Sequence, residues 1–424
     1  MEIAVNPAEK EWSELLKRPE TDAFLLEKSV RKILQQVKLK GDTAVRKYSF
    51  QFDGVRLKNM EVGKKEIEAS ATLLPDELKE AISVAAKNIR MFHEKQVSEE
   101  LVVETMPGII CRRKSVGIDK VGLYIPGGTA PLFSTILMLG IPASIAGCKE
   151  IILCSPPGKD GQLDPAILYT ASLVGINRIF KVGGVQAIGA MAFGTSSIPK
   201  VYKIFGPGNQ YVTAAKQLVQ QDGVAIDMPA GPSEVCVLCD HTANPSFVAA
   251  DLLSQAEHGI DSQVLLVSTS AELVKNVLDQ IALQLETLPR KETARKALDN
   301  SRAIIAESME TAMQIVNAYA AEHLIIASDE ANQWSEKVCN AGSVFLGHYT
   351  PESVGDYASG TNHTLPTNGY ARAYSGVSVD SFVKKITFQQ LTEVGLKSIM
   401  PAVTTMAEHE GLKAHAEAVR IRFS

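Results

Sequence analysis

The sequence lacks the features that mark several protein classes. Its six cysteines are too few to form a disulfide scaffold in a chain of 424 residues. Its net charge of −5 gives no electrostatic basis for binding nucleic acid or an anionic membrane. No apolar run approaches the roughly 18 residues that a membrane span needs. The N-terminus is charged from Glu2 and has no apolar signal segment, so the expected compartment is a reducing cytoplasm.

The standard nucleotide-binding fingerprints are missing as well. None of the glycine loops has the pattern GxGxxG, and none is a Walker A motif. Cys236 and Cys239 have CxxC spacing, but they lie in "SEVCVLCD", which has the apolar content of a buried strand. We therefore interpret these cysteines as core residues of a strand, in preference to a redox pair or a zinc site.

The order of apolar segments predicts an α/β fold with several domains. Short apolar runs that end in glycine or proline alternate with helical segments, which is typical of parallel sheets. This alternation predicts two Rossmann-like parallel-sheet domains, at 121–232 and 233–376. We expect 1–120 to form an N-terminal helical region that packs on the second of these domains. Residues 377–424 are expected to form a small helical C-terminal tail, which would dock elsewhere, for example on a second subunit.

Three successive loops place glycines directly after predicted strands. They are "YIPGGTAP" (124–131), "VGGVQAIGA" (182–190) and "FGPGNQY" (205–211). Ligands of open parallel sheets bind at the carboxyl ends of strands, where glycines let the backbone approach phosphates. A single loop of this kind is more often a tight turn between a strand and a helix. Three of them, each with a polar or aromatic neighbour, favour a nucleotide cleft.

A polar stripe lies near the end of a helix that Asn244 is expected to cap and Gly259 to end. Asp251, Gln255 and His258 fall on the face opposite its apolar line. Such a stripe is usually a solvated face. The alternative is half of a metal site, which would need further oxygen or nitrogen ligands from elsewhere in the chain.

Two other stretches carry acid–base groups. Glu322 and His323 are adjacent where a helix gives way to an apolar strand, and could serve as two separate general acid–base groups. The ordinary alternative is a charged strand start. Residues 355–376 include Asp356 and His363 without an apolar period, and a long loop of this kind is more often functional than not.

The C-terminal stretch "AEHEGLKAHAEAV" contains Glu410 and His415. On their own these two residues would be ordinary members of a surface helix. Together with "SQAEHG", "AEHL" and "SVGDYASGTNH", however, the stretch forms an ordered series of motifs, which also includes "YIPGG", "GGVQAIGAMAFGT" and "GPGN". In order and spacing, over nearly the whole chain, this series resembles histidinol dehydrogenase.

The resemblance implies a zinc-dependent enzyme that oxidises L-histidinol to L-histidine in two NAD-linked steps, the last of histidine biosynthesis. The family's metal ligands correspond here to Gln255, His258, Asp356 and His415. Its acid–base pair corresponds to Glu322 and His323, and its NAD contacts to Tyr124, Gln186 and Asn209. The substrate would be bound by the metal ligands and His323 together with Ser233, His363 and Glu410.

The resemblance also implies a homodimer in which the tail is exchanged, so that it completes the site of the partner. Two alternatives remain open from the residues alone. One is a related NAD-dependent dehydrogenase of another small alcohol on the same scaffold. The other is a zinc hydrolase, because a carboxylate, an imidazole and zinc can activate water without NAD.

Overall fold

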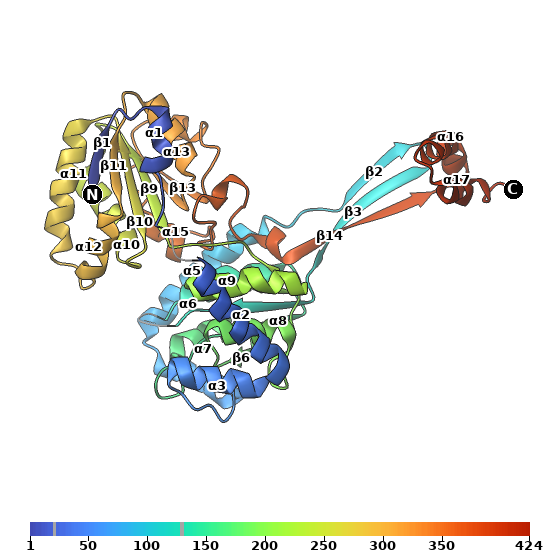
Figure 1. The fold of residues 1–424 in the computed structure, drawn as a ribbon, viewed down its shortest axis with the longest axis horizontal. Helices are drawn as coiled ribbons and strands as arrows, with labels where there is room; N and C mark the ends of the chain where they lie inside the picture. The colour runs from blue at the N-terminus through green and yellow to red at the C-terminus, as the bar shows by residue number, and fades with distance from the viewer. Residues whose placement is uncertain (20–22, 128–130) are drawn as a thin grey trace.

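The structure is a computed structural model that describes residues 1–19, 23–127 and 131–424. It has two α/β bodies and a long arm of three strands, which carries the last two helices away from both bodies (Figure 1). Within the described residues, no helix combines the length and apolar character that crossing a bilayer requires.

The first α/β body is built on a five-stranded parallel sheet with the order β6-β5-β4-β7-β8. Its strands are β4 (Lys120–Tyr124), β5 (Glu150–Cys154), β6 (Arg178–Phe180), β7 (Lys203–Phe205) and β8 (Ala225–Ile226). The intervening helices are α6 (Phe133–Ile145), α7 (Pro165–Leu173), α8 (Gly184–Phe193) and α9 (Gln210–Val219), with the short η1 (Gln220–Asp222) after α9. The alternation of strand, glycine loop and helix predicted for this part is confirmed.

The second body has a six-stranded parallel sheet with the order β1-β11-β10-β9-β12-β13. Its strands are β1 (Glu2–Val5), β9 (Glu234–Cys239), β10 (Gln263–Ser268), β11 (Arg302–Ile305), β12 (His323–Ala327) and β13 (Ser343–Leu346). Its helices are α1 (Glu9–Leu15), α10 (Pro245–Ala256), α11 (Ala271–Leu285), α12 (Lys291–Asp299), α13 (Met309–Tyr319), α14 (Ala331–Ser335) and α15 (Glu352–Tyr357). Cys236 and Cys239 lie on β9 as free, fully buried thiols, so their interpretation as core residues is confirmed.

The expectation that the N-terminal helices pack on the second body is wrong for most of them. These helices are α2 (Ala23–Lys40), α3 (Asp42–Asp53), α4 (Lys64–Leu73) and α5 (Asp76–Glu94). They cover the first body: α2 and α3 contact α8, α4 contacts α7, and α5 contacts α6. The reason is that the apolar face of α2, with Val30 and Val37, completes the core beside Ile188. In the described part of this region, β1 and the region of α1 belong to the second body, where Leu16 joins the core.

The arm corrects two further expectations, because part of 1–120 is strand and the tail is not wholly helical. It is an antiparallel sheet of order β14-β3-β2, formed by β2 (Leu101–Met106), β3 (Ile109–Gly117) and β14 (Val383–Leu391). Strand β14 pairs with β3 from Val383 opposite Gly117 to Leu391 opposite Ile109, so a long-range partner gives the tail its sheet. At its tip, α16 (Glu393–His409) and α17 (Lys413–Arg420) pack on each other. Two short helices, η2 (Tyr370–Arg372) and η3 (Val379–Phe382), precede β14.

Candidate functional site

The acid–base candidates Glu322 and His323 stand at the amino end of β12, beside β9. Helix α13 ends at Tyr319, and Ala320 takes a left-handed conformation with φ 56° before the strand begins. Both side chains are buried, with 6% of Glu322 and 4% of His323 exposed. Glu322 Oε2 accepts a hydrogen bond of 3.0 Å from the backbone N–H of Glu234. The pair therefore sits in protein, with only a small part of each residue open to solvent.

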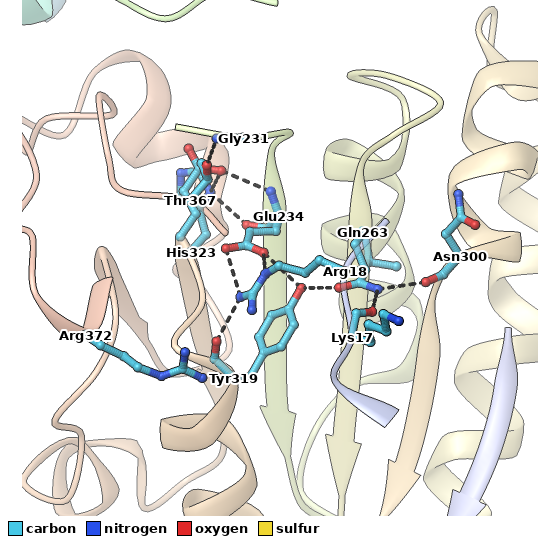
Figure 2. Close-up of polar contacts among 12 residues, drawn as sticks. Lys17, Arg18, Gly231, Glu234, Gln263, Asn300, Tyr319, His323, Thr367 and Arg372 are labelled. Carbon is cyan, nitrogen blue, oxygen red and sulfur yellow. Dashed lines mark hydrogen bonds and ion pairs between the residues drawn. The ribbon is translucent and has the colours of Figure 1, made fainter. Parts of the chain in front are cut away.

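The imidazole of His323 lies between several oxygen atoms (Figure 2). Its Nδ1 is 3.3 Å from the carbonyl oxygen of Glu234 and 3.7 Å from Glu322 Oε2, and its Nε2 is 3.3 Å from Asp356 Oδ1. Burial alone lowers the pKa of His323, but the carboxylates of Glu322 and Asp356 outweigh it and raise that pKa. Burial in turn raises the pKa of Glu322. The two groups can therefore hold and exchange protons within a shielded site.

The polar stripe of α10 is not a solvated face at its most important position. The predicted N-cap is confirmed, since Asn244 accepts from the backbone N–H of Ser246. The helix ends at Ala256, however, with Glu257 as its C-cap, before the Gly259 that was expected to end it. Gln255 is fully buried. With its amide nitrogen turned to the carboxylate of Glu352, that nitrogen lies 3.1 and 3.3 Å from the two oxygens. The side chain of Gln255 is thus fixed inside the protein.

His258 and Asp356 supply a neutral nitrogen and a charged oxygen near this position. His258 keeps part of its surface open to solvent, but the loss of solvent around its ring lowers its pKa, which favours the neutral ring. Burial raises the pKa of Asp356, but His323, His363 and His258 outweigh it and lower that pKa, so the carboxylate stays charged. Neutral imidazole and carboxylate are donors that suit zinc, and the amide oxygen of Gln255 would be a weaker one.

The structure does not bring all the predicted metal and substrate residues together. Glu410 follows α16 and His415 lies on α17, and both are exposed at the tip of the arm, away from the two bodies (Figure 1). Among the described residues of this one chain, no three His, Cys, Asp or Glu side chains form a complete metal cluster. Gln255, His258 and Asp356 therefore make an incomplete set within a single copy.

A cavity of about 1560 Å³ separates the two bodies at this point. Its walls include Ser233, His258, Glu322 and His363 from the second body, and the loop 206–209 from the first. His363 bridges the two bodies, because its Nδ1 is 2.7 Å from the carbonyl oxygen of Asp356 and its Nε2 is 3.1 Å from Thr135 Oγ1 of α6. Of the predicted substrate residues in this chain's bodies, Ser233, His258 and His363 thus line this cavity, whereas Gln255, His323 and Asp356 are not among its described walls.

A second cavity of about 1250 Å³ lies at the carboxyl end of the first sheet. Its walls include all three predicted NAD contacts, Tyr124, Gln186 and Asn209. Asn209 and Tyr211 also line the larger cavity, so the two spaces adjoin at the start of α9. Residues 128–130 of the first glycine loop lie outside the described part of the chain.

The second cavity contains buried polar atoms without hydrogen-bond partners among the described residues. Gln186 is 1% exposed, and neither its amide oxygen nor its nitrogen has a hydrogen-bond partner among the residues that the structure describes. The hydroxyl of Tyr124 accepts from the N–H of Gly184 at 3.0 Å, and burial raises the pKa of Tyr124 to about 12, which keeps it neutral. Unsatisfied buried amides are costly, so Gln186 indicates a polar ligand in this space.

Comparison with known proteins decides between the remaining possibilities for the family. The sequence model described as histidinol dehydrogenase matches residues 16–423. The chain belongs to the histidinol dehydrogenase family. A histidinol dehydrogenase of Bacteroides thetaiotaomicron is 58% identical over 424 residues, which are 100% of this chain and 99% of that protein. One from Xylella fastidiosa is 53% identical over 409 residues, covering 96% of this chain and 95% of that protein.

The fold agrees with this assignment. The crystal structure of histidinol dehydrogenase from Elizabethkingia anophelis matches with a TM-score of 0.97 and 54% identity, covering 100% of this chain and 98% of that one. As a member of the histidinol dehydrogenase family, the chain is an oxidoreductase of histidine biosynthesis. The resemblance found in the sequence motifs is confirmed at the level of the family.

Some residues of this histidinol dehydrogenase site were missed in the sequence. Arg18 and Glu234 form an ion pair directly behind the acid–base pair. Asp53 lines the second cavity with one buried carboxylate oxygen that has no hydrogen-bond partner in the described chain. The only signal for Glu234 is a charged residue at the entrance of the apolar run "VCVLC". Arg18 and Asp53 stand in no motif, and only the folded chain brings them to the site.

Proposed function

We propose that this chain catalyses the four-electron oxidation of L-histidinol to L-histidine through L-histidinal, with two NAD⁺ and one zinc ion per subunit. The observation that carries the proposal is the buried pair of Glu322 and His323, of which Glu322 lines a large cavity. That cavity adjoins a second one lined by the three candidate NAD residues. Acid–base groups and a nucleotide-sized space in contact are what a dehydrogenase needs.

We assign the zinc ligands to Gln255, His258 and Asp356 of one subunit and His415 of another. The burial of Gln255, the lowered pKa of His258 and the charge of Asp356 support this donor set. When bound, zinc would hold the amine and imidazole of the substrate and NAD would accept hydride, so the metal's role is mainly orientation.

The position of the arm supports a homodimer with exchanged tails. His415 and Glu410 lie at its tip, away from the cavity that they would serve (Figure 1). The arm exposes large apolar side chains, among them Val394, Met406 and Ile421. A monomer would leave this surface in water, whereas docking on a second copy would bury it. In the dimer, each arm would bring Glu410 and His415 to the partner's cavity.

His323 is assigned the role of the base in both oxidations. Its Nδ1–H donates to the carbonyl oxygen of Glu234, since a carbonyl can only accept, and its Nε2 lies 3.3 Å from Asp356 Oδ1. We therefore assign proton transfer to Nε2, with the carboxylate of Asp356 stabilising the imidazolium that forms. In the first step, the carbinol O–H gives its proton to Nε2 as the C–H bond gives hydride to NAD⁺, which leaves the aldehyde and NADH.

Glu322 is assigned the hydration of the aldehyde. Its carboxylate takes one proton from water as the water oxygen bonds to the carbonyl carbon, and the carbonyl oxygen takes the proton that His323 Nε2 gained in the first step, which gives the gem-diol and leaves His323 neutral again. The diol then loses a hydroxyl proton to His323 and a hydride to a second NAD⁺, which gives the carboxylic acid. The bond from the backbone N–H of Glu234 fixes Glu322 for this role. Ser233, His363 and the partner's arm would hold the substrate in the meantime.

The test is the formation of NADH from L-histidinol and NAD⁺, followed by its near-ultraviolet absorbance. We expect NADH to form, to stop after treatment with a chelator, and to return when zinc is restored. Faster reduction of NAD⁺ with another small alcohol would favour the related-dehydrogenase alternative. An absence of NADH with every alcohol, together with zinc-dependent hydrolysis of an ester or amide, would favour the hydrolase alternative and contradict the proposal.

A further inference from the structure

A network of polar contacts lies beside the acid–base pair (Figure 2), and one of its members, Arg18, also lines the large cavity. The centre of this network is Glu234, the first residue of β9, which is 2% exposed. The backbone of this one residue contacts both members of the pair. Its N–H donates to Glu322 Oε2 at 3.0 Å, and its carbonyl oxygen lies 3.3 Å from His323 Nδ1. The orientation of the pair therefore depends on where the Glu234 peptide is held.

The side chain of Glu234 is held by Arg18. Arg18 Nε and Nη2 donate to the two carboxylate oxygens at 2.5 and 3.1 Å, which is the two-pronged geometry that only a guanidinium provides. The guanidinium also lies over the ring of Tyr319, with its central carbon 4.1 Å from the ring centroid. Arg18 follows α1, so the contact links the N-terminal segment to β9 across 216 residues of sequence.

Arg18 also holds the second segment that carries the pair. Its Nη2 donates to the carbonyl oxygen of Tyr319 at 2.8 Å, three residues before Glu322. The hydroxyl of Tyr319 lies 2.9 Å from Gln263 Oε1, and the amide nitrogen of Gln263 donates to the carbonyl oxygen of Lys17 at 3.0 Å. One guanidinium thus ties the start of β9 to the end of α13, and the chain that carries it is itself anchored by Gln263.

We infer that Arg18 is a positioning residue for the oxidation chemistry: through Glu234 and Tyr319 it fixes the orientation of His323 and Glu322. The expected effect of Arg18 on kcat rests on the proposed function, whereas its expected effect on the orientation of the His323 imidazole does not. Buried ion pairs add little net stability against apolar replacements, so stability alone gives a weak reason for this pair. A displacement of a reacting group by about 1 Å can lower the rate by about a hundredfold, so the positioning of His323 and Glu322 is a stronger reason for this ion pair.

The experiment compares the zinc-loaded wild type with Arg18→Met, Arg18→Lys and Lys181→Met. Lys181→Met is the matched control, because it removes an ion pair of 2.8 Å with Glu66 in the first body. Labelled histidine gives the Nδ1 resonances of the eight histidines, and a His323→Gln variant identifies that of His323. Thermal unfolding of each variant reports whether it is folded.

In Arg18→Met we expect the His323 Nδ1 resonance to shift or broaden. We also expect kcat with histidinol to fall by roughly tenfold to a hundredfold, while both KM values stay within about twofold. Arg18→Lys, which keeps the charge but loses the fork, should be intermediate in both readouts. Lys181→Met should leave the resonance and kcat as in the wild type even where its melting temperature falls.

An unchanged His323 resonance in folded Arg18→Met, or in Arg18→Lys if the first variant does not fold, would overturn the inference. A proportional rise of KM with no loss of kcat would overturn it as well. If the wild type forms no NADH from histidinol, the proposed function fails, and the resonance still decides whether Arg18 orients His323.

Discussion

The two α/β bodies of this molecule face the two adjoining cavities with opposite ends of their sheets. The first body presents the carboxyl ends of β4, β6 and β7, where glycines and the buried amide of Gln186 leave an open space. The second presents the amino ends of β9 and β12, where Glu234, Glu322 and His323 are packed as buried charges. One edge is built to receive a ligand, and the other to hold proton-transfer groups in place.

The difference also appears in how each edge is stabilised. Beside the first sheet, Lys216 and Asp227 form a buried ion pair of 2.5 Å, and both bond to the backbone of Gly206. Gly206 has φ 123°, and a Cβ there would meet the carbonyl oxygen of Tyr124. In that body charged side chains hold a backbone loop, whereas in the second body the backbone of Glu234 holds charged side chains. Substitutions at the two edges should therefore change different kinetic constants.

The largest effect is expected at the edge of the second sheet. His323→Ala should lower kcat for histidinol by roughly a hundredfold to ten-thousandfold, since the proton acceptor is lost. Glu322→Gln should mainly slow the conversion of added histidinal to histidine. Both rates are measured as NADH formation in single-turnover and steady-state assays. Oxidation of histidinal by Glu322→Gln at the wild-type rate would show that Glu322 has another role.

The second prediction concerns the arm, which belongs to neither sheet edge. Gln255→Ala and His415→Ala should each be nearly inactive, because each removes a proposed zinc ligand. After an equal mixture is exchanged, half of the dimers are hybrids with one intact site of two, so about one quarter of the wild-type activity should return. Mass spectrometry of the mixture verifies the exchange. If hybrids form but no activity returns, the arms do not complete their partners' sites.

The smallest of these effects is expected at the edge of the first sheet. Gln186→Leu removes an amide that has no hydrogen-bond partner among the described residues, so the fold should tolerate it. Its KM for NAD⁺ should rise by roughly tenfold, with kcat and the KM for histidinol little changed. A fall in kcat with an unchanged KM for NAD⁺ would show that Gln186 acts in the chemical step and not in binding NAD⁺. The two sheet edges would then not differ in the way described above.

Much of the fold could be predicted because its elements carry local signals. The apolar strands with glycine ends, such as β7, and the capped helix α10 were found from their own residues. The packing of α2 was not, because an apolar stripe does not state which sheet it covers. Strand β14 was missed because its partner β3 lies more than 250 residues away and both are partly exposed.

The residues of the candidate site also differ in how far the sequence could predict them. Adjacent residues such as Glu322 and His323 are visible as a pair in the sequence, and the family motifs add the rest of the proposed ligands. The burial of Gln255 overturned the ordinary interpretation of its stripe, since helix periodicity gives a polar face but not what covers it. The role of Arg18 could not be predicted from the sequence, because it depends on a contact between distant segments that no local pattern encodes.

The most direct test of the central claim is the ratio of NADH formed to histidinol consumed, measured with the product identified by mass spectrometry. Two adjoining cavities beside one acid–base pair predict two NADH for each histidinol, with L-histidine as the product and little free histidinal. A ratio of one, with histidinal accumulating in solution, would contradict the account, because Glu322 would then have no aldehyde to hydrate.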